Sequence, residues 1–373
     1  MDRNGRGRCS TDPFRLTEYE GALWGRGASA SKGPALCWLH VLEAFKQRGD
    51  EPPVNLRLIF DTAAEVGSPG LPSLLRERRR ALLRDVEFVC ATVGQRVGKR
   101  LCACHAARGL CYFHLTVAGA ERDAHSGACG GVMHEPLGDL LFLLDSLHGK
   151  GGRIAVPELL EDVVQATADE ETSYSRMELE MEDMRRHAGN ANLLSGESKT
   201  RLLMQRWRMP TITLHGIEGA FSEPGGRPVI PRAVVGKFSV RLVPNQRCER
   251  VARGVRRHVA AAWQQRASPN SMTLHLTAAV EPWIESAGTK HFQASLRALK
   301  LVAPVVEPET GRLGGAVPGA PVLQALTGRS VVVLPLGGAR DTARGHNEHI
   351  TLFDYMQGHR IVAAYMQEIA NMK

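Results

Sequence analysis

The two ends of the chain repeat the same alternation of helix and strand patterns, and this feature most narrows the fold. Apolar residues recur at helical spacing in some segments, and alternate with polar residues, as in a strand, in the segments that follow them. Helices are predicted over 35–47, 71–83 and 353–370, and strands over 54–60, 86–91 and 330–334. Such alternation is typical of an α/β sheet with helical crossovers.

The middle of the chain has a different pattern. Strands are predicted over 110–118, 211–214 and 234–242, and helices over 133–147 and 250–264. Consecutive strands here are not separated by regularly spaced helices. The chain is therefore predicted to leave an α/β domain, build an α+β domain, and return to the first.

Length and composition favour a water-soluble protein. With 373 residues, 43% hydrophobic and 23% charged, the chain can bury one large or two medium cores. No apolar run reaches the roughly 18 residues that a membrane helix needs, and the first residues lack the apolar core of a signal peptide. The eight cysteines are scattered, so we expect reduced thiols. A cytoplasmic protein without membrane contacts is the expectation.

The net charge of +8 raises the question of nucleic-acid binding. The arginines that follow Arg76 share their predicted helix with several leucines. This pattern favours an ordinary amphipathic helix, with the leucines on a buried face and the arginines exposed to solvent, over a nucleic-acid-binding surface. No aromatic side chains lie among them to stack on bases. We therefore expect no nucleic-acid partner, and a basic protein that binds acidic partners is the weakest of three functional hypotheses.

A glycine-rich loop carries the strongest motif. Residues 123–127 read Asp-Ala-His-Ser-Gly, and Gly130 and Gly131 follow. This loop resembles that of the carnosine dipeptidase and cytosolic non-specific dipeptidase family, which are di-zinc metallopeptidases. Further stretches resemble the family in the same order, at 25–28, 32–34, 206–208, 215–222, 229–232 and 234–245.

The resemblance implies a discontinuous catalytic domain with an inserted lid domain that forms the dimer. The catalytic α/β domain would comprise 1–108 and 283–373, and the α+β lid 109–282. The family carries an N-terminal strand that ends in a His-x-Asp metal motif, and the present sequence starts after it. The catalytic sheet is therefore expected to be incomplete at its N-terminus.

The family's metal site is largely lost at the matching positions. The resemblance places Ala30 at the bridging aspartate, Val93 at a further carboxylate ligand, and Arg344 at a histidine ligand. Ala64 stands for the general base, and Glu65 is the one ligand retained. The family implies two zinc or manganese ions, whereas here we expect none or at most one weakly held ion. Arg344 is expected to pair with Glu65 within about 6 Å, relieving a buried carboxylate.

A rebuilt metal site is the alternative. His346, Glu348 and His349 lie within four residues, and Asp61 and Glu65 are candidates to join them. The competing interpretation is a polar loop that precedes the last helix.

The resemblance also assigns residues that bind substrate. His125 matches the histidine that stabilises the oxyanion across the dimer, and the less favoured alternative is a structural histidine in a Gly-rich turn. Arg241 matches an arginine that holds the substrate carboxylate, a task suited to a planar guanidinium. Three other contact positions are changed, at Pro228, Ala278 and Ala316.

Two main hypotheses follow. The first is a dipeptidase-like pseudoenzyme whose lid forms a homodimer, or a heterodimer with an active relative to which it donates His125. The alternative is an active metal-dependent dipeptidase that cleaves small dipeptides through a rebuilt site.

Overall fold

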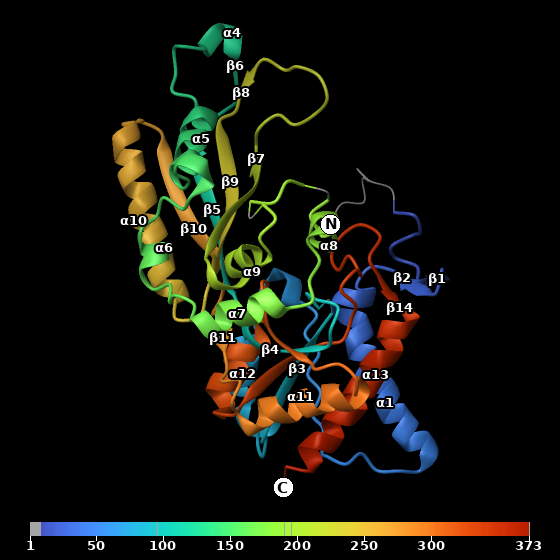
Figure 1. The fold of residues 1–373 in the computed structure, drawn as a ribbon. Coiled ribbons are helices and arrows are strands. Elements are labelled where there is room, and N and C mark those ends of the chain that lie inside the picture. The colour runs from blue at the N-terminus through green and yellow to red at the C-terminus, as the bar shows by residue number, and fades with distance from the viewer. Residues whose placement is uncertain (1–8, 95, 190, 195, 373) are drawn as a thin grey trace.

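The chain ends build a five-stranded sheet in the lower half of the molecule (Figure 1). The computed structural model describes residues 9–94, 96–189, 191–194 and 196–372. The strand order is β11-β4-β13-β3, and β12 pairs with β4. β3 runs parallel to β13, and β12 parallel to β4, which confirms the α/β class. The strands are β3 (Val89–Val93), β4 (Cys102–Ala107), β11 (Trp283–Ile284), β12 (Glu309–Leu313) and β13 (Val331–Pro335).

Helices cover both faces of this sheet because its central strand is apolar on both sides. Val332 and Leu334 of β13 face one buried cluster, and Val331 and Val333 face another. Helices α1 (Gly33–Arg48), α11 (Lys290–Val302) and α13 (Leu352–Ala370) pack on the first cluster, and α12 (Gly319–Thr327) on the second. Helices α2 (Leu71–Glu77) and α3 (Arg79–Leu82) precede β3, and α2 packs on α12.

Local signals explain where the long helices begin and end. Pro34 lies in the first turn of α1, and Gly49 ends that helix in a left-handed conformation with φ of 73°. The Thr351 hydroxyl accepts a hydrogen bond from the Asp354 N–H at 3.0 Å and caps α13.

The middle of the chain forms an antiparallel sheet covered on one face by two helices (Figure 1). The order is β10-β5-β9-β7, from strands β5 (Gly109–Ala118), β7 (Thr211–Glu218), β9 (Ala233–Leu242) and β10 (Ser271–Val280). Alternate residues of β5 are buried against α5 (Pro136–Ser146) and α10 (Cys248–Arg266). This is the predicted α+β lid, although its boundaries at 108 and 282 stay predictions.

Helix α6 (Glu158–Glu161) packs on α10 and adds Leu159 to the core of the lid. A layer of short helices lies between the lid and the lower sheet, formed by α7 (Ala168–Arg176), α8 (Met181–His187) and α9 (Lys199–Arg208) (Figure 1). Tyr174 of α7 packs edge-on against Trp207 of α9, with ring centroids 5.2 Å apart. An ion pair joins this layer to the lower sheet: Glu170 of α7 lies 2.9 Å from Arg312 of β12.

Short elements complete the fold. β1 (Thr17–Tyr19), β2 (Ala22–Trp24) and β14 (His349–Thr351) form one small sheet. β6 (Ala124–His125) pairs with β8 (Val229–Ile230) beside α4 (Ser126–Cys129) at the tip of the lid. The remaining turns are η1 (Ala28–Lys32), η2 (Ala64–Val66) and η3 (Lys150–Gly152).

The strand predicted over 54–60 is wrong. This segment has no strand partner in the described part of the chain, and strands are stable only when their backbone groups are paired. Val54 and Leu58 still pack against the lower core, whereas Phe60 is 57% exposed. Leu56 is also exposed, at 37%, so only every second residue of the alternating set contacts the core and the alternation does not mark one buried face. The helix predicted over 71–83 is divided at Arg78 into α2 and α3.

The described residues include no helix that is both long enough and apolar enough to cross a membrane. All eight cysteines are free thiols, as expected.

Candidate functional site

The parallel pairing of β3 and β13 brings the candidate site together. Because both strands end at the same edge, the Gly337 N–H reaches the Gly94 carbonyl at 3.0 Å just beyond Val93. The turn that holds Ala30 packs directly against this edge. A Cβ atom built on Gly94 would lie 1.9 Å from the Ser29 carbonyl oxygen, so only glycine permits this approach.

Glu348 holds the Ala30 turn in place from the opposite side. Its carboxylate is 4% exposed and accepts hydrogen bonds from the N–H groups of Gly27 at 3.0 Å and Ala30 at 2.8 Å. Arg26 adds an ion pair at 3.0 Å. Glu348 is therefore engaged in fixing the chain, as a buried carboxylate must be.

The side chains of the alternative, rebuilt metal site make other contacts. His349 stacks on Trp24 with ring centroids 4.3 Å apart, and its Nδ1 lies 2.9 Å from the Asn347 carbonyl oxygen. His346 lies beside Cys9, with 4.0 Å between Nδ1 and Sγ. Within the described ranges, no three or more His, Cys, Asp or Glu side chains are grouped so that they could hold a metal ion.

Arg344 and Glu65 form the expected pair. The Arg344 Nε donates to Glu65 Oε1 at 2.9 Å and to Oε2 at 2.8 Å. The expected reason for the pair is wrong, because the two side chains are 58% and 52% exposed. A pair so open to water contributes roughly 0–1 kcal/mol to stability. Asp61 is turned toward its own loop, where it accepts the Ala63 N–H at 2.8 Å.

The residues at the matched positions do not fit a two-metal centre. Such a centre needs ligands with free lone pairs, including one carboxylate shared by both ions. Ala30 and Val93 offer only hydrocarbon, and the guanidinium of Arg344 has no lone pair to give. Glu65 keeps its carboxylate but shares it with Arg344.

Positive charge gathers on the lid side of the same site. The guanidinium of Arg241, on β9, makes no hydrogen bond or ion pair with any described residue. Burial, followed by the charge of Arg344, lowers the pKa of Arg241, and Glu65 opposes that shift. Burial also lowers the pKa of Arg108 to about 9, with Arg241 and Arg206 contributing, so Arg108 stays charged at neutral pH. Grouped guanidiniums without a carboxylate partner favour an anionic ligand.

His215 lies next to this group of arginines. Its Nε2 is 2.8 Å from the Ser239 Oγ, and its ring is parallel to that of Tyr112 with centroids 5.2 Å apart. Burial and the nearby Arg241 charge lower the pKa of His215, so the ring is neutral at neutral pH.

Sequence reasoning identified Arg241 but missed Arg108, Arg206 and His215. The available signal was their position, because Arg108 directly precedes an apolar strand and Arg206 lies in an Arg-Trp-Arg run.

His125 lies far from these residues within one chain. It belongs to β6 at the tip of the lid, whereas the Ala30 turn lies at the edge of the lower sheet (Figure 1). The ring is exposed, and its Nδ1 accepts the Gly127 N–H at 3.0 Å. A role at the oxyanion therefore requires a second chain and stays a prediction.

Comparison with known proteins extends over nearly the whole sequence. A sequence model described as peptidase family M20/M25/M40 matches residues 3–368. The Beta-Ala-His dipeptidase of Homo sapiens is 36% identical over 363 residues, which cover 97% of this chain and 71% of the relative. The Cys-Gly metallodipeptidase dug1 of Schizosaccharomyces pombe is 35% identical over 365 residues, covering 97% and 76%.

Solved structures agree with this assignment. Human carnosine dipeptidase 1 superposes with a TM-score of 0.89 at 35% identity, covering 97% of this chain and 77% of that one. The di-peptidase Dug1p of Saccharomyces cerevisiae gives 0.92 at 34% identity, covering 97% and 76%. The chain therefore belongs to peptidase family M20/M25/M40, and these relatives are metallodipeptidases.

Proposed function

We propose that this protein binds dipeptides through their carboxylate but does not hydrolyse them by a two-metal mechanism. The observation that carries the proposal is the bifurcated hydrogen bond from the Arg344 Nε–H to both carboxylate oxygens of Glu65, at positions that the resemblance assigns to metal ligands. Arg344 replaces a histidine ligand of the family with a group that cannot bind a metal ion, and it also hydrogen-bonds Glu65, the one carboxylate ligand that remains.

The chemistry of peptide hydrolysis explains why the substitutions matter. A metal-bound water must lose a proton to become a nucleophile, and a nearby carboxylate usually takes it. Ala64 supplies no such base, and loss of a general base alone typically lowers the rate by about a hundredfold or more. Ala30 and Val93 remove further metal ligands.

Binding is favoured by the arginines that remain. Arg241 offers an unengaged guanidinium, and the partly buried charges of Arg108 and Arg206 increase the positive potential around it. A planar guanidinium binds a carboxylate through two parallel hydrogen bonds. The relatives' names describe dipeptidases, which indicates the size of ligand to test first.

One experiment combines three measurements on the purified protein. Mass spectrometry measures the metal content. A hydrolysis assay follows the cleavage of β-alanyl-histidine and cysteinyl-glycine with zinc or manganese added. Calorimetry measures the binding of the same dipeptides. The Schizosaccharomyces pombe enzyme serves as the positive control. We expect dipeptide binding without turnover and less than one metal ion per chain. Two ions per chain with turnover would overturn the proposal and support the active alternative.

We further propose that the lid pairs two chains and presents His125 to the neighbouring site. Its exposed ring on β6, at the tip of the lid, supports this role. Sedimentation velocity tests for the homodimer. A mixed dimer with an active relative tests donation, because His125→Ala in this chain should then lower the activity of the relative's site. An unchanged rate in a confirmed mixed dimer contradicts it.

A further inference from the structure

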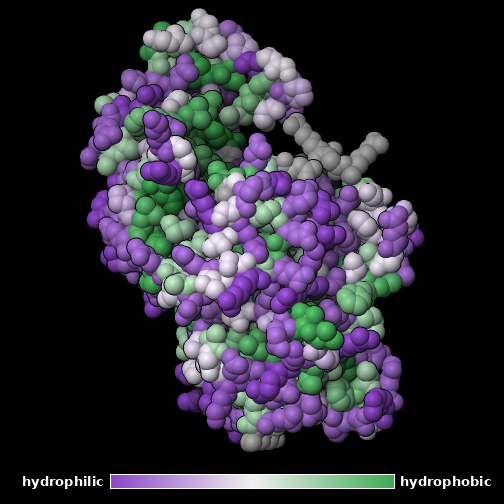
Figure 2. Space-filling view, in the orientation of Figure 1, coloured by the Kyte–Doolittle hydropathy of each residue, from purple (hydrophilic) through white to green (hydrophobic). Residues whose placement is uncertain are grey.

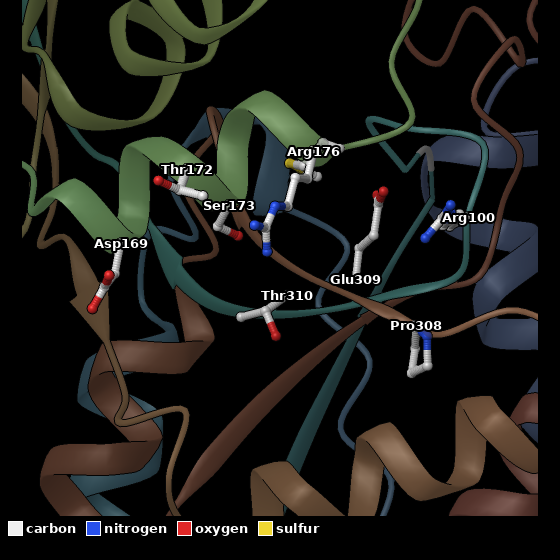
Figure 3. Close-up of a pocket in the computed structure, with 9 residues that line it drawn as sticks. Arg100, Asp169, Thr172, Ser173, Arg176, Pro308, Glu309 and Thr310 are labelled. Carbon is white, nitrogen blue, oxygen red and sulfur yellow. The ribbon is translucent and has the colours of Figure 1, made fainter.

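A cavity of about 420 Å³ opens between α7 and the start of β12, and none of the candidate site residues lines it (Figure 3). Its volume is within the range of small-molecule pockets. The walls are mainly polar, with guanidinium, carboxylate and hydroxyl groups from Arg100, Asp169, Ser173, Arg176, Glu309 and Thr310. Such a lining selects polar, charged ligands over apolar ones.

One face of α7 forms the upper wall. Asp169, Ser173 and Arg176 are spaced by four and three residues, so they share a side of the helix. The opposite side is fixed by Tyr174, which is 3% exposed and packs on Trp207. The backbone that carries the exposed, cavity-facing side chains is therefore anchored by a packed face of the helix.

Several groups in the cavity lack a protein partner. Among the described residues, the guanidinium of Arg176 and the carboxylate of Asp169 make no ion pair or hydrogen bond. The same holds for the hydroxyls of Ser173 and Thr310, and Figure 3 shows Ser173 and Arg176 pointing from α7 toward the β12 segment that carries Thr310.

The other two charged groups each have at least one protein partner. Arg100 pairs with Glu178 at 2.8 Å, and Glu309 accepts the Glu178 N–H at 2.8 Å. Burial raises the pKa of Glu309, whose second oxygen is buried without a partner. Among the described lining residues, Arg176 and Asp169 are thus the charged groups with no protein partner at all, and Glu309 keeps one unpartnered oxygen.

We propose that this cavity binds a short zwitterionic peptide, of two or three residues, with free ends. Its carboxylate would meet Arg176 and its ammonium group Asp169, while the hydroxyls of Ser173 and Thr310 bind peptide groups between them. Asp169 and Arg176 are seven residues apart, which is about 10 Å along a helix, so the ligand must separate its charges by more than one amino acid does. Asp169 and Glu309 disfavour an anion with several charges.

The test uses triglycine as the probe and calorimetry on the full chain. All proteins carry Arg241→Gln, so that the carboxylate site of the lid does not contribute. We expect triglycine to bind in this background, and Arg176→Gln or Asp169→Asn to weaken it at least about tenfold. The matched control is Arg253→Gln on α10, a 66% exposed arginine outside the cavity.

Blocked probes test each end of the ligand. N-acetylated triglycine, which lacks the ammonium group, should bind the Arg241→Gln parent more weakly than triglycine does. In the Asp169→Asn variant, the two peptides should bind equally. Triglycine amide, which lacks the carboxylate, should likewise bind the parent more weakly than triglycine but bind the Arg176→Gln variant equally. Three results would overturn the proposal: no triglycine binding in the Arg241→Gln background, equal binding by Arg176→Gln and the control, or tighter binding of inorganic phosphate than of triglycine. None depends on whether the protein hydrolyses dipeptides.

Discussion

Two regions border the candidate site, and they differ in how firmly the fold constrains them. Arg241 belongs to β9, a central strand of a regular sheet, between fully buried neighbours such as Val240 and Leu242. Arg344 and Glu65 belong to a loop and a short turn, and both are more than half exposed. Residues on a packed strand are coupled to folding, whereas loop residues are not. The residues on the loop side of the site, Arg344 and Glu65, can therefore change while Arg241, on the strand side, is kept.

The largest expected effect comes from the packing beneath β9. Phe238 is fully buried and stacks on Phe113, with ring centroids 5.0 Å apart. Phe238→Ala should lower the free energy of unfolding by about 3–5 kcal/mol, through lost burial and the cavity left behind. Denaturant unfolding measures this. Leu214 pairs with Phe238 across the strands but is 44% exposed, so Leu214→Ala is the matched control. Equal losses in both variants would break the contrast between buried and exposed positions.

A buried histidine in the lower sheet's core sets the next effect. His291 contacts Ser330 and Tyr365 through its two ring nitrogens, at 3.0 Å and 2.6 Å, and burial lowers its pKa to about 4. The unfolded chain binds this proton more readily, at its ordinary pKa of 6.5. The protonation of His291 therefore leaves the free energy of unfolding unchanged above about pH 6.5 and lowers it as the pH falls toward 4, by up to about 3 kcal/mol.

Unfolding free energies of the wild type and of His291→Gln between pH 7 and 4 test this. The variant should lose less stability over the range than the wild type. His275→Gln on the exposed face of β10 should instead follow the wild type. If the wild type and His291→Gln have parallel pH curves, the buried histidine is not the cause.

A third effect separates binding from stability on β9. Arg241→Ala should weaken dipeptide binding by roughly a hundredfold, because losing one partner of a desolvated guanidinium–carboxylate pair costs about 2–5 kcal/mol and Arg241 is partly buried before any ligand covers it. Arg241→Lys should recover only part, since an ammonium lacks the planar fork. Calorimetry measures affinity, and thermal unfolding should show both variants folded. Unchanged affinity in Arg241→Ala would place the dipeptide elsewhere.

Local patterns in the sequence were enough to predict most elements. α1 and α13 have periodic apolar residues and end signals within the segment, and β13 is apolar on both faces, so each was predicted nearly in full. Residues 54–60 have the same kind of local pattern but no strand. Whether a strand forms depends on a partner elsewhere in the chain, which alternation alone does not report.

The candidate site divides in the same way. The meeting of Arg344 with Glu65 could be predicted because each position matched a motif of the family. The grouping of Arg108 and Arg206 near Arg241 could not, because it depends on how the lid and the layer of short helices pack together. The cavity under α7 likewise joins residues more than a hundred positions apart, such as Arg176 and Thr310.

The smallest expected effect is on the loop side, and it tests the comparison most directly. Arg344→Ala removes the contact with Glu65, yet both side chains are open to water, so unfolding should change by no more than about 1 kcal/mol. Removing a cation that lowers the pKa of Arg241 should also weaken dipeptide binding slightly. Unfolding and calorimetry on the same variant measure both. Because Arg344 lies on a loop at a left-handed φ of 67°, Arg344→Gly separates side-chain loss from backbone strain. A stability loss near that of Phe238→Ala, shared by both Arg344 variants, would mean that the loop side is as constrained as the sheet.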